Sequence, residues 1–304
     1  MEKTVAETIK QITKNHIDKN KGIVIGQCLT AVGWVQNTIP PRKKGTIELP
    51  MTDIAGSGIA VGASLIGGRP IFVLRFQSLL WLNASPIVNY AAKAKTLFGY
   101  PAPIFVRAIA SEGGGQGPIH TGSFHSMFMS VPNIFICSPM TPKEYKKIWV
   151  EFMKKNDPFL VSEHRRSYKS SKELDDIYLY KKPDLTLFGI SSTRFDCVEV
   201  VKILKKKGIK VNLVNVLWLK PTKFSKKQLN SLRNSKFGLV VDSSYEICGA
   251  TRSIAYDLSN LTEKKVYALG AEDRIPGAAE RLENASPTIK MIISKIRKLL
   301  KKTN

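Results

Sequence analysis

Two residues of the chain stand where side-chain chemistry is plausible. Asp53 is the single carboxylate at the head of "PMTDIAGSGIAVGAS" (50–64), a run of small and aliphatic residues. His120 follows a glycine-rich stretch within "SEGGGQGPIHTGSFHSMF" (111–128). A carboxylate can accept a hydrogen bond or a proton from a ligand, and histidine as a residue type titrates near neutral pH. Together they indicate acid–base or substrate-orienting chemistry.

Asp53 has two interpretations. As an N-cap or first-turn acid it would stabilise a helix through its terminal N–H groups and dipole, which sequence physics alone favours. The alternative is a functional carboxylate at a helix N-terminus. Gly56, Gly58 and Gly62 are not spaced as G-x-G-x-x-G and no buried strand directly precedes them, so dinucleotide binding is not indicated. The small residues favour close helix packing.

The stretch 111–128 follows an apolar strand, and its glycines can bring backbone N–H groups close to a ligand. It lacks the Lys-Ser/Thr ending of a triphosphate-binding loop. His120 is either a structural or a functional histidine, with equal weight. His125 has no third ligand clustered near it, so no metal site is predicted. No nucleophile motif for covalent catalysis is present.

Apolar runs rich in β-formers alternate with longer helical patterns in the first half of the chain. This alternation predicts parallel strands with helical crossovers, an α/β three-layer sandwich with a mainly parallel sheet. Thr141 and Pro142 mark a helix start. The expected strands are 22–27, 70–76, 103–110, 133–139 and 158–164, and the expected helices are 54–68, 85–99 and 141–156.

The pattern lapses in "RRSYKSSKELDDIYLYKK" and then resumes. We therefore predict a first domain over 1–164, a linker over 165–182 and a smaller second α/β domain over 183–304, a division that suits a chain of 304 residues. The N-terminal twenty residues are amphipathic and mixed in charge, which indicates a first helix of the fold instead of a secretory signal.

The net charge of +23 raises the question of nucleic acid. Much of it lies in lysine-rich helix faces such as "KILKKKGIK" with few aromatic residues between, which favours solvated surface or pairing with an acidic partner subunit. The four cysteines lack C-x-x-C spacing, typical of a reducing cytoplasm. No apolar run reaches about 20 residues, so a soluble protein with no membrane span is expected.

Several segments together resemble the β subunit of the thiamine-diphosphate-dependent 2-oxoacid dehydrogenases (the E1 component), and more distantly the C-terminal half of transketolase. They are "PMTDIAGSGIAVGASLIGGRPIFVLRF", "VNYAAK", "PNIFICSPMTPKE", "DPFLVSEH" and "LGAEDRIPGAAERLENASPTI". The resemblance spans nearly the whole chain. It implies a pyrimidine-binding domain followed by a transketolase C-terminal domain.

The resemblance also implies a partner. In that family an α-type chain holds the diphosphate and Mg²⁺ through a G-D-G…N signature, and the two chains form an α2β2 tetramer. This sequence contains no G-D-G. It is therefore expected to supply the pyrimidine-side wall of a thiamine diphosphate site shared with such an α-type subunit, with a lipoyl acyltransferase core as a possible further partner.

The family's catalytic positions carry over to two residues. The acid that matches Asp53 is a glutamate in the family, where it hydrogen-bonds N1′ of the aminopyrimidine and promotes formation of the ylid. Aspartate is one methylene shorter, which removes about 1.5 Å of reach. The family's histidine is retained as His120, and in the family it faces the reaction centre.

Other matched positions depart from the family. A glutamate after the first strand is replaced by Gln27 or Cys28, a methionine against the pyrimidine by Arg75, and a stacking phenylalanine by Leu79. A fixed cation beside N1′ opposes its protonation unless Arg75 pairs with Asp53 or with a substrate carboxylate.

A potassium site of the family is also altered. The family often binds K⁺ through a loop that matches "MKKNDP", where Lys155 falls at an acidic ligand. Either the ammonium of Lys155 replaces the ion, or the lysine is solvated and no ion binds.

Three functions remain open on this reading. The leading one is an E1β-like subunit that oxidatively decarboxylates pyruvate or a related 2-oxoacid with its partner. The second is a divergent transketolase-type or decarboxylase-type half-enzyme acting on another keto donor. The third is a non-catalytic scaffold or regulatory subunit, which the residues at positions 53, 75 and 79 keep open.

Overall fold

The structure, a computed structural model, describes residues 2–30, 33–41, 44–52, 54–112, 115–283 and 286–303. The chain forms two compact units. The first is Met1–Ser111 with Ile119–Glu173, and the second is Glu112–Pro118 with Leu174–Asn304. Residues 165–173 of the predicted linker fold within the first unit: Ser167 and Tyr168 are 1% exposed there.

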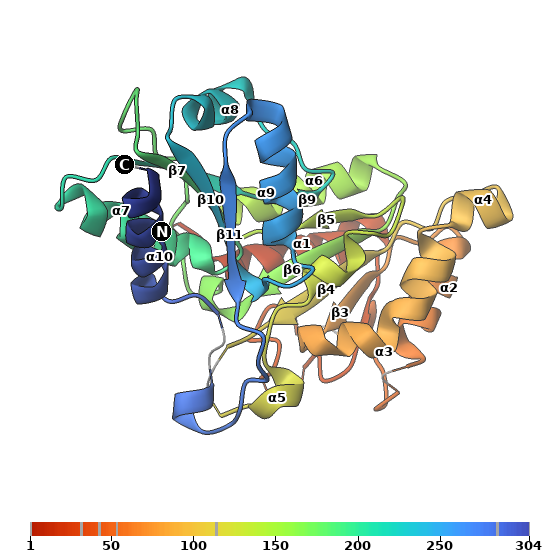
Figure 1. Cartoon of the computed structure of the whole chain (residues 1–304). Helices are drawn as coiled ribbons and strands as arrows, with labels where there is room; N and C mark the ends of the chain where they lie inside the picture. The colour runs from red at the N-terminus through yellow and green to blue at the C-terminus, as the bar shows by residue number, and fades with distance from the viewer. Residues whose placement is uncertain are drawn as a thin grey trace. The chain divides into compact units, whose positions relative to one another are not determined.

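The first unit is built on a parallel sheet (Figure 1). Its six strands lie in the order β2-β1-β3-β4-β6-β5, and every described pairing among them is parallel. The central strands β3, β4 and β6 are buried along their whole length, as expected of a sheet covered on both faces. The strands are β1 (Val24–Gly26), β2 (Thr46–Glu48), β3 (Ile71–Leu74), β4 (Phe105–Ala110), β5 (Phe135–Cys137) and β6 (Phe159–His164).

Helices cover both faces of this sheet. The ring of Phe105 on β4 packs on Tyr145, Trp149 and Phe152 of α6 (Pro142–Lys154), and α6 packs on α1 (Val5–Asn20). Side chains alternate along a strand, so Phe72 on β3, whose register partner is Val106 and not Phe105, points to the opposite face. There it meets Gly56 of α2 (Gly56–Leu65). The predicted three-layer α/β sandwich is confirmed.

The helix that follows position 53 begins without a side-chain cap of its own. Its N-cap position is Ala55, and Asp53, for which we expected an N-cap or first-turn role, lies outside the described residues. The backbone N–H of Ser57 instead donates to Oδ1 of Asn83 at 3.1 Å, and Nδ2 of Asn83 donates to the Leu79 carbonyl. A residue of α3 (Leu80–Ser85) thus anchors the first turn of α2.

One predicted helix, 85–99, is divided in the structure. It consists of a π-helical segment, η2 (Pro86–Ala91), and a short α4 (Ala94–Phe98). Pro86 at the first position lacks an N–H group and crowds the preceding turn, which favours a wider turn at this point. The remaining helical segments are η1 (Gln77–Leu79), α5 (Gly117–His120), η3 (His125–Phe128) and η4 (Arg165–Ser167). Thr141 caps α6 as predicted, accepting the N–H of Glu144.

The second unit is a smaller α/β fold that is also built on a parallel sheet. Its parallel sheet has the order β11-β10-β7-β8. The helices α7 and α10 pack on the face of the sheet that carries Leu187, and α8 contacts Thr186 on the opposite face. Its elements are β7 (Leu185–Ile190), α7 (Thr193–Lys205), β8 (Val211–Val216), β9 (Trp218–Lys220), α8 (Lys226–Arg233), β10 (Phe237–Tyr245), α9 (Ala250–Thr262), β11 (Val266–Ala271), η5 (Glu280–Leu282) and α10 (Ile289–Thr303).

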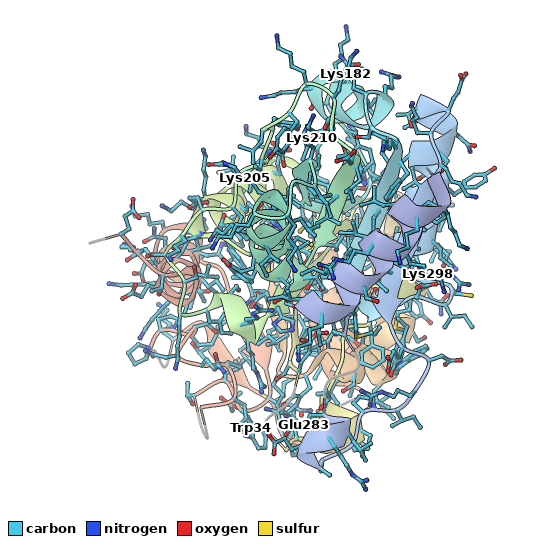
Figure 2. All side chains as sticks on the ribbon, turned by 60° about the vertical axis from the view of Figure 1, so that its left-hand side comes forward. Trp34, Lys182, Lys205, Lys210, Glu283 and Lys298 are labelled. Carbon is cyan, nitrogen blue, oxygen red and sulfur yellow. The ribbon has the colours of Figure 1, made fainter. Side chains whose placement is uncertain are left out.

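Lysines of the second unit point outward from their elements. Lys182, Lys205, Lys210 and Lys298 are all exposed, and Figure 2 shows their side chains extending from the ribbon. Within the described ranges, no helix combines the length and apolar character needed to cross a membrane.

Candidate functional site

The candidate site lies at the carboxyl edge of the first unit's sheet. Gln27 directly follows β1, Arg75 and Phe76 follow β3, and Arg165 follows β6. Because β1, β3, β4 and β6 are neighbours and parallel, these residues gather at one edge, where ligands bind in open α/β sheets.

Gln27, Arg75 and Leu79, which the sequence predicted as cofactor contacts, lie together. They are 6%, 5% and 7% exposed. Nη1 of Arg75 donates to Oε1 of Gln27, and Nη2 lies 3.7 Å from Sδ of Met51. These side chains help to line a cavity of about 10 Å³ beside Gly56 and Asn83.

The volume of this cavity shows whether the ring of a cofactor could enter it. A volume of about 10 Å³ accommodates roughly one water molecule. Side chains that receive an aromatic ring from outside must present free surface to it, whereas these three are already buried by their own chain. As arranged here they do not admit an aminopyrimidine, and we derive no reaction step through it from them. Their predicted role stays a prediction.

His120 lies on an aromatic ring at the same edge. Its imidazole is half-buried and stacks on Phe76, with ring centres 4.2 Å apart and planes tilted by 33°. The ring of Trp34, which is 38% exposed, lies with its centre 5.9 Å from the centre of the same phenylalanine ring. The Phe76 ring thus packs against the imidazole of His120, the candidate acid–base group.

The segment on either side of His120 is held by the residues after Phe76. Oγ of Ser78 donates to the Ile119 carbonyl, and Oε1 of Gln77 accepts the N–H of Phe124. Nε2 of Gln77 donates to the Ala108 carbonyl at 3.1 Å and to Oγ of Ser162 at 2.9 Å. The sheet therefore fixes the backbone that carries His120.

Arg165 completes this cluster with a cation. Its Cζ lies 4.6 Å from the Phe76 ring centre, and Nη2 donates to the carbonyls of Arg75, at 2.9 Å, and Trp34, at 3.2 Å. Burial lowers the pKa of Arg165 because it penalises the charged form. No carboxylate in the described part of the chain pairs with this guanidinium.

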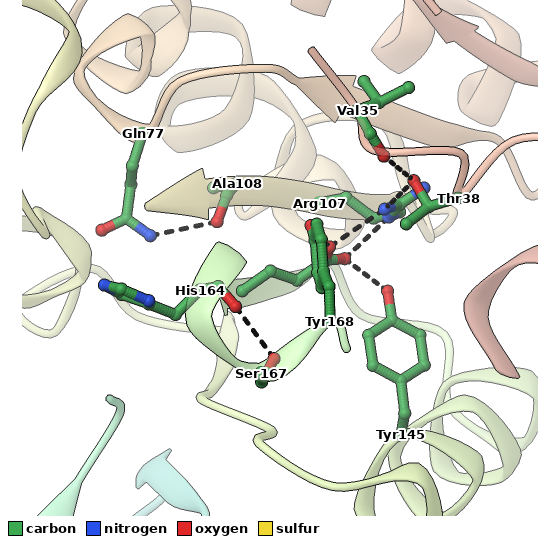
Figure 3. Close-up of polar contacts among 10 residues, drawn as sticks. Val35, Thr38, Gln77, Arg107, Ala108, Tyr145, His164, Ser167 and Tyr168 are labelled. Atoms are coloured by element: carbon green, nitrogen blue, oxygen red, sulfur yellow. Dashed lines mark hydrogen bonds and ion pairs between the residues drawn. The ribbon is translucent and has the colours of Figure 1, made fainter. Parts of the chain in front are cut away.

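A second arginine, Arg107 on the neighbouring strand β4, has its charge compensated by a carboxylate. Nε and Nη2 of Arg107 donate to both carboxylate oxygens of Glu163, at 2.7 and 2.9 Å, and Nη2 also donates to Thr38 (Figure 3). Tyr145 and Tyr168 donate their hydroxyls to the same carboxylate. Burial alone would lower the pKa of Arg107, but the charge of Glu163 raises it above its ordinary value. This cluster is structural, since both charges are 1% exposed.

The loop that follows α6 has an unexpected cation. Nη1 of Arg69 donates to the carbonyls of Phe152 and Lys155, at 2.9 and 2.8 Å, and Nη2 donates to Oδ1 of Asn156. The ammonium of Lys155 points instead to the Phe135 ring, 5.9 Å from its centre. The loop carbonyls are thus bonded by Arg69.

Sequence reasoning missed Arg165, Phe76 and Trp34. Arg165 could have been found, since the rule that favours His120, a polar residue after a parallel strand, applies to it as well. It was assigned to the linker because the residues after it are polar. No group of three or more potential metal-ligating side chains occurs among the described residues.

The fold and its edge site define a class, the two-unit α/β chains of transketolase type. Residues 12–171 match the family "Transketolase, pyrimidine binding domain", and residues 178–290 match "Transketolase, C-terminal domain". Since the first match alone covers more than half of the chain, the chain belongs to this family.

Individual relatives refine the class. The chain is 26% identical over 235 residues to the β subunit of acetoin:2,6-dichlorophenolindophenol oxidoreductase of Cupriavidus necator, covering 73% of this chain and 68% of that protein. It is 26% identical over 263 residues to the mitochondrial pyruvate dehydrogenase E1 component subunit beta of Dictyostelium discoideum, covering 79% and 73%. The resemblance to E1β subunits drawn from the sequence is confirmed.

A solved structure supports the fold. The chain superposes on a split gene transketolase, described as an inactive beta4 tetramer, with a TM-score of 0.76. The alignment covers 100% of both chains at 15% sequence identity. The predicted fold class is thereby confirmed.

Proposed function

We propose that this chain is the β-type subunit of a thiamine-diphosphate-dependent enzyme that oxidatively decarboxylates a 2-oxoacid and is active only with an α-type partner. The E1β relatives support the class, and the missing G-D-G signature supports the need for a second chain. The cofactor would then lie between the two chains, with its diphosphate and Mg²⁺ on the partner.

The observation that carries this proposal is an exposed apolar face. Half of the large apolar side chains exposed in the described residues fall within residues 51–100. The segments α2, α3, η2 and α4, which carry most of these side chains, pack on one another, and a large exposed apolar area is typical of a protein interface. Its members are Met51, Ile54, Ile59, Ile66, Trp81, Leu82, Tyr90, Leu97, Phe98 and Tyr100, with exposures from 39% to 89%.

The finer parts of the proposal follow the resemblance. We propose a G-D-G…N motif on the partner, an α2β2 heterotetramer, a lipoyl acyltransferase core as acceptor, and a cytoplasmic location, which the four free thiols suit. We propose domains over 1–164 and 183–304 with a connecting segment over 165–182, of which residues 165–173 pack within the first unit. We propose no nucleic-acid partner. In the K⁺ loop Arg69 occupies two carbonyls, which supports the absence of an ion there.

The proposed catalytic residues are Asp53 and His120. His120 has the exposure and the rigid support that an acid–base group needs. Asp53 is proposed as the partner of the pyrimidine nitrogen on the resemblance alone. Gln27, Arg75 and Leu79 remain proposed cofactor contacts, on condition that the Arg75 side chain withdraws from the cavity.

The test is calorimetric titration of thiamine diphosphate and Mg²⁺ into the co-purified pair of chains. We expect saturable binding by the pair and none by this chain alone. Absence of binding by an intact pair would refute the enzymatic proposal. Unchanged turnover in Asp53→Ala would remove the role of that residue.

One observation favours a second function. The cavity of about 10 Å³ beside Arg75 is what a scaffold subunit that had lost its cofactor contacts would show. The variant Arg75→Met separates the two, since it removes the guanidinium and keeps an apolar chain of similar length. A gain in cofactor affinity in Arg75→Met, starting from no binding in the wild-type pair, would favour the scaffold.

A further inference from the structure

A groove on the surface of the first unit runs along α1 and carries mostly positive charge. Its volume is about 620 Å³, which is within the range of pockets that bind ligands. One wall is a face of α1, and the other is a pair of prolines. The described residues that line it are Lys3, Glu7, Lys10, Gln11, Lys14, Pro40 and Pro41.

The charged wall follows from the helical spacing of its residues. Positions 7, 10, 11 and 14 are related as i, i+3, i+4 and i+7, so their side chains lie on one face of α1. Lys3 precedes the helix, and its Nζ reaches Oε1 of Gln11 on that face at 3.5 Å. Three ammonium groups therefore line a single hollow.

The groups around these lysines leave their charge available to a ligand. Nζ of Lys10 donates to Oδ1 of Asn37 at 2.8 Å, a neutral acceptor. Within the described ranges, none of the three lysines forms an ion pair with a carboxylate. Glu7 accepts hydrogen bonds from the N–H and the hydroxyl of Thr4, at 2.7 and 2.9 Å, which lowers the pKa of Glu7 and stabilises its charge at the helix terminus. With three lysines against one glutamate, the groove attracts an anion.

The opposite wall is apolar and rigid. Pro40 is buried and Pro41 is exposed, so the ring of Pro41 presents apolar surface to the groove. Neither proline has an N–H group to donate, and the φ angle of each is fixed by its ring. Such a wall packs against the backbone or an apolar side chain of a bound segment, whereas the contacts with its charges fall to α1.

The spacing of the lysines fits an extended peptide. Lys10 and Lys14 are four residues apart, which places them about 6 Å apart along the helix axis. Side chains on one side of an extended chain recur about every 6.6 Å. Acidic residues at alternate positions of such a chain therefore match these two lysines, and Lys3 is available to a third.

We propose that this groove binds an acidic segment of a partner protein in extended conformation, with its carboxylates on Lys3, Lys10 and Lys14 and its backbone against Pro41. A single-stranded nucleic acid is held in part by bases stacked on aromatic side chains, and none of the described lining residues is aromatic. The groove shares no residue with the apolar face within residues 51–100. The inference goes beyond the proposed function and does not rest on it.

The test is titration of the full chain into fluorescently labelled hexaglutamate, followed by fluorescence anisotropy. An ionic strength of about 0.15 M screens attraction beyond about 8 Å, which suppresses diffuse binding caused by the net charge of +23. We expect saturable binding of one peptide per chain. Hexaglutamine, which has the same length and no charge, should bind at least tenfold more weakly.

Two double variants localise the binding. Lys3→Gln with Lys14→Gln removes two exposed lysines of the groove and should weaken hexaglutamate binding about five- to tenfold, as expected for the loss of two exposed ion pairs. Lys290→Gln with Lys301→Gln removes the same charge, at the same separation along the chain, from exposed positions of α10. This control should leave the affinity within about twofold.

Absence of saturable hexaglutamate binding, or equal binding of hexaglutamine, would overturn the inference from the wild-type chain alone. So would equal weakening by the two double variants, since it would indicate general surface charge. A labelled hexamer of deoxythymidine that binds more tightly than hexaglutamate, and is weakened only by the groove variant, would assign the groove to nucleic acid instead. Because no thiamine diphosphate is present, these outcomes are independent of the titration that tests the proposed function.

Discussion

Arg107, inside strand β4, and Arg165, which follows β6 at the carboxyl edge of the same sheet, lie in opposite electrostatic settings. Arg107 is bidentate to Glu163 inside the core. Among the described residues Arg165, two residues along the chain from that glutamate, donates to two carbonyls and packs on a ring. The pKa of the first is raised by its partner's charge, and that of the second is lowered by burial. One arginine is thus stabilised by a buried counterion, and the other by backbone carbonyls and an aromatic ring.

The largest effect is expected when the buried ion pair between Arg107 and Glu163 is broken. Glu163→Gln leaves the buried Arg107 without a compensating charge, so we expect a loss of about 3–5 kcal/mol in the free energy of unfolding. Urea denaturation measures it. Glu199→Gln, which removes one half of the exposed pair with Lys202, should change stability by less than about 0.5 kcal/mol. Similar losses in both variants would show that burial does not make the Arg107–Glu163 pair more important to stability than an exposed pair.

The next effect concerns the apolar face. Trp81 is 61% exposed, so Trp81→Glu should leave this chain folded and weaken association with the α-type partner by about 2–4 kcal/mol. Sedimentation of the mixed chains gives the dissociation constant. The matched control is Tyr256→Glu on α9, which is 68% exposed and lies outside that face. Equal weakening by the two variants would argue against the face as the interface.

A smaller effect tests the backbone that positions Gln27. A Cβ atom at Gly26, the last residue of β1, would lie 2.7 Å from the carbonyl oxygen of Val73. Gly26→Ala should therefore cost about 1–3 kcal/mol of stability. Gly62 on α2 has open space around it, and Gly62→Ala should stabilise this chain by about 0.5–1 kcal/mol. Thermal unfolding compares the two, and a stabilising Gly26→Ala would show that β1 and β3 can separate.

The smallest effect is a pH dependence. Burial lowers the pKa of His16 below its ordinary value, although the bond from its Nε2 to the Arg69 carbonyl, at 2.7 Å, opposes this. The unfolded chain therefore binds the proton more readily, and stability falls as the pH drops from about 6.5, the pKa of an unperturbed histidine, toward the folded value. Urea midpoints between pH 7.5 and 5 measure it. A slope unchanged in His16→Gln would assign the effect to another group.

Much of the fold could be predicted because short, mostly apolar strands alternate with longer helical patterns, which the sequence reveals by itself. The strand expected at 158–164 and the helix expected at 141–156 correspond closely to β6 and α6. The division of 85–99 escaped the prediction because the sequence there is helical throughout, and only the ring of Pro86 marks the wider turn.

Less of the candidate site could be predicted. His120 was found because the glycines before it are a local signal. The stack of His120 on Phe76, and the contact of Arg165 with that ring, join residues 44 and 89 positions apart along the chain. No local pattern reports such neighbours, since the order of strands in the sheet decides them. Asp53 lies outside the described residues, and its role stays a prediction.

The order β4-β6-β5 has a consequence for synthesis of the chain. β5 (Phe135–Cys137) leaves the ribosome before β6 (Phe159–His164), yet in the described part of the first unit it pairs with β6, which lies between it and β4. The nascent sheet must leave a gap for the later strand. Until His164 has emerged, the edges of β4 and β5 that face β6 carry unpaired backbone N–H and C=O groups, and this interval is when a chaperone is most needed.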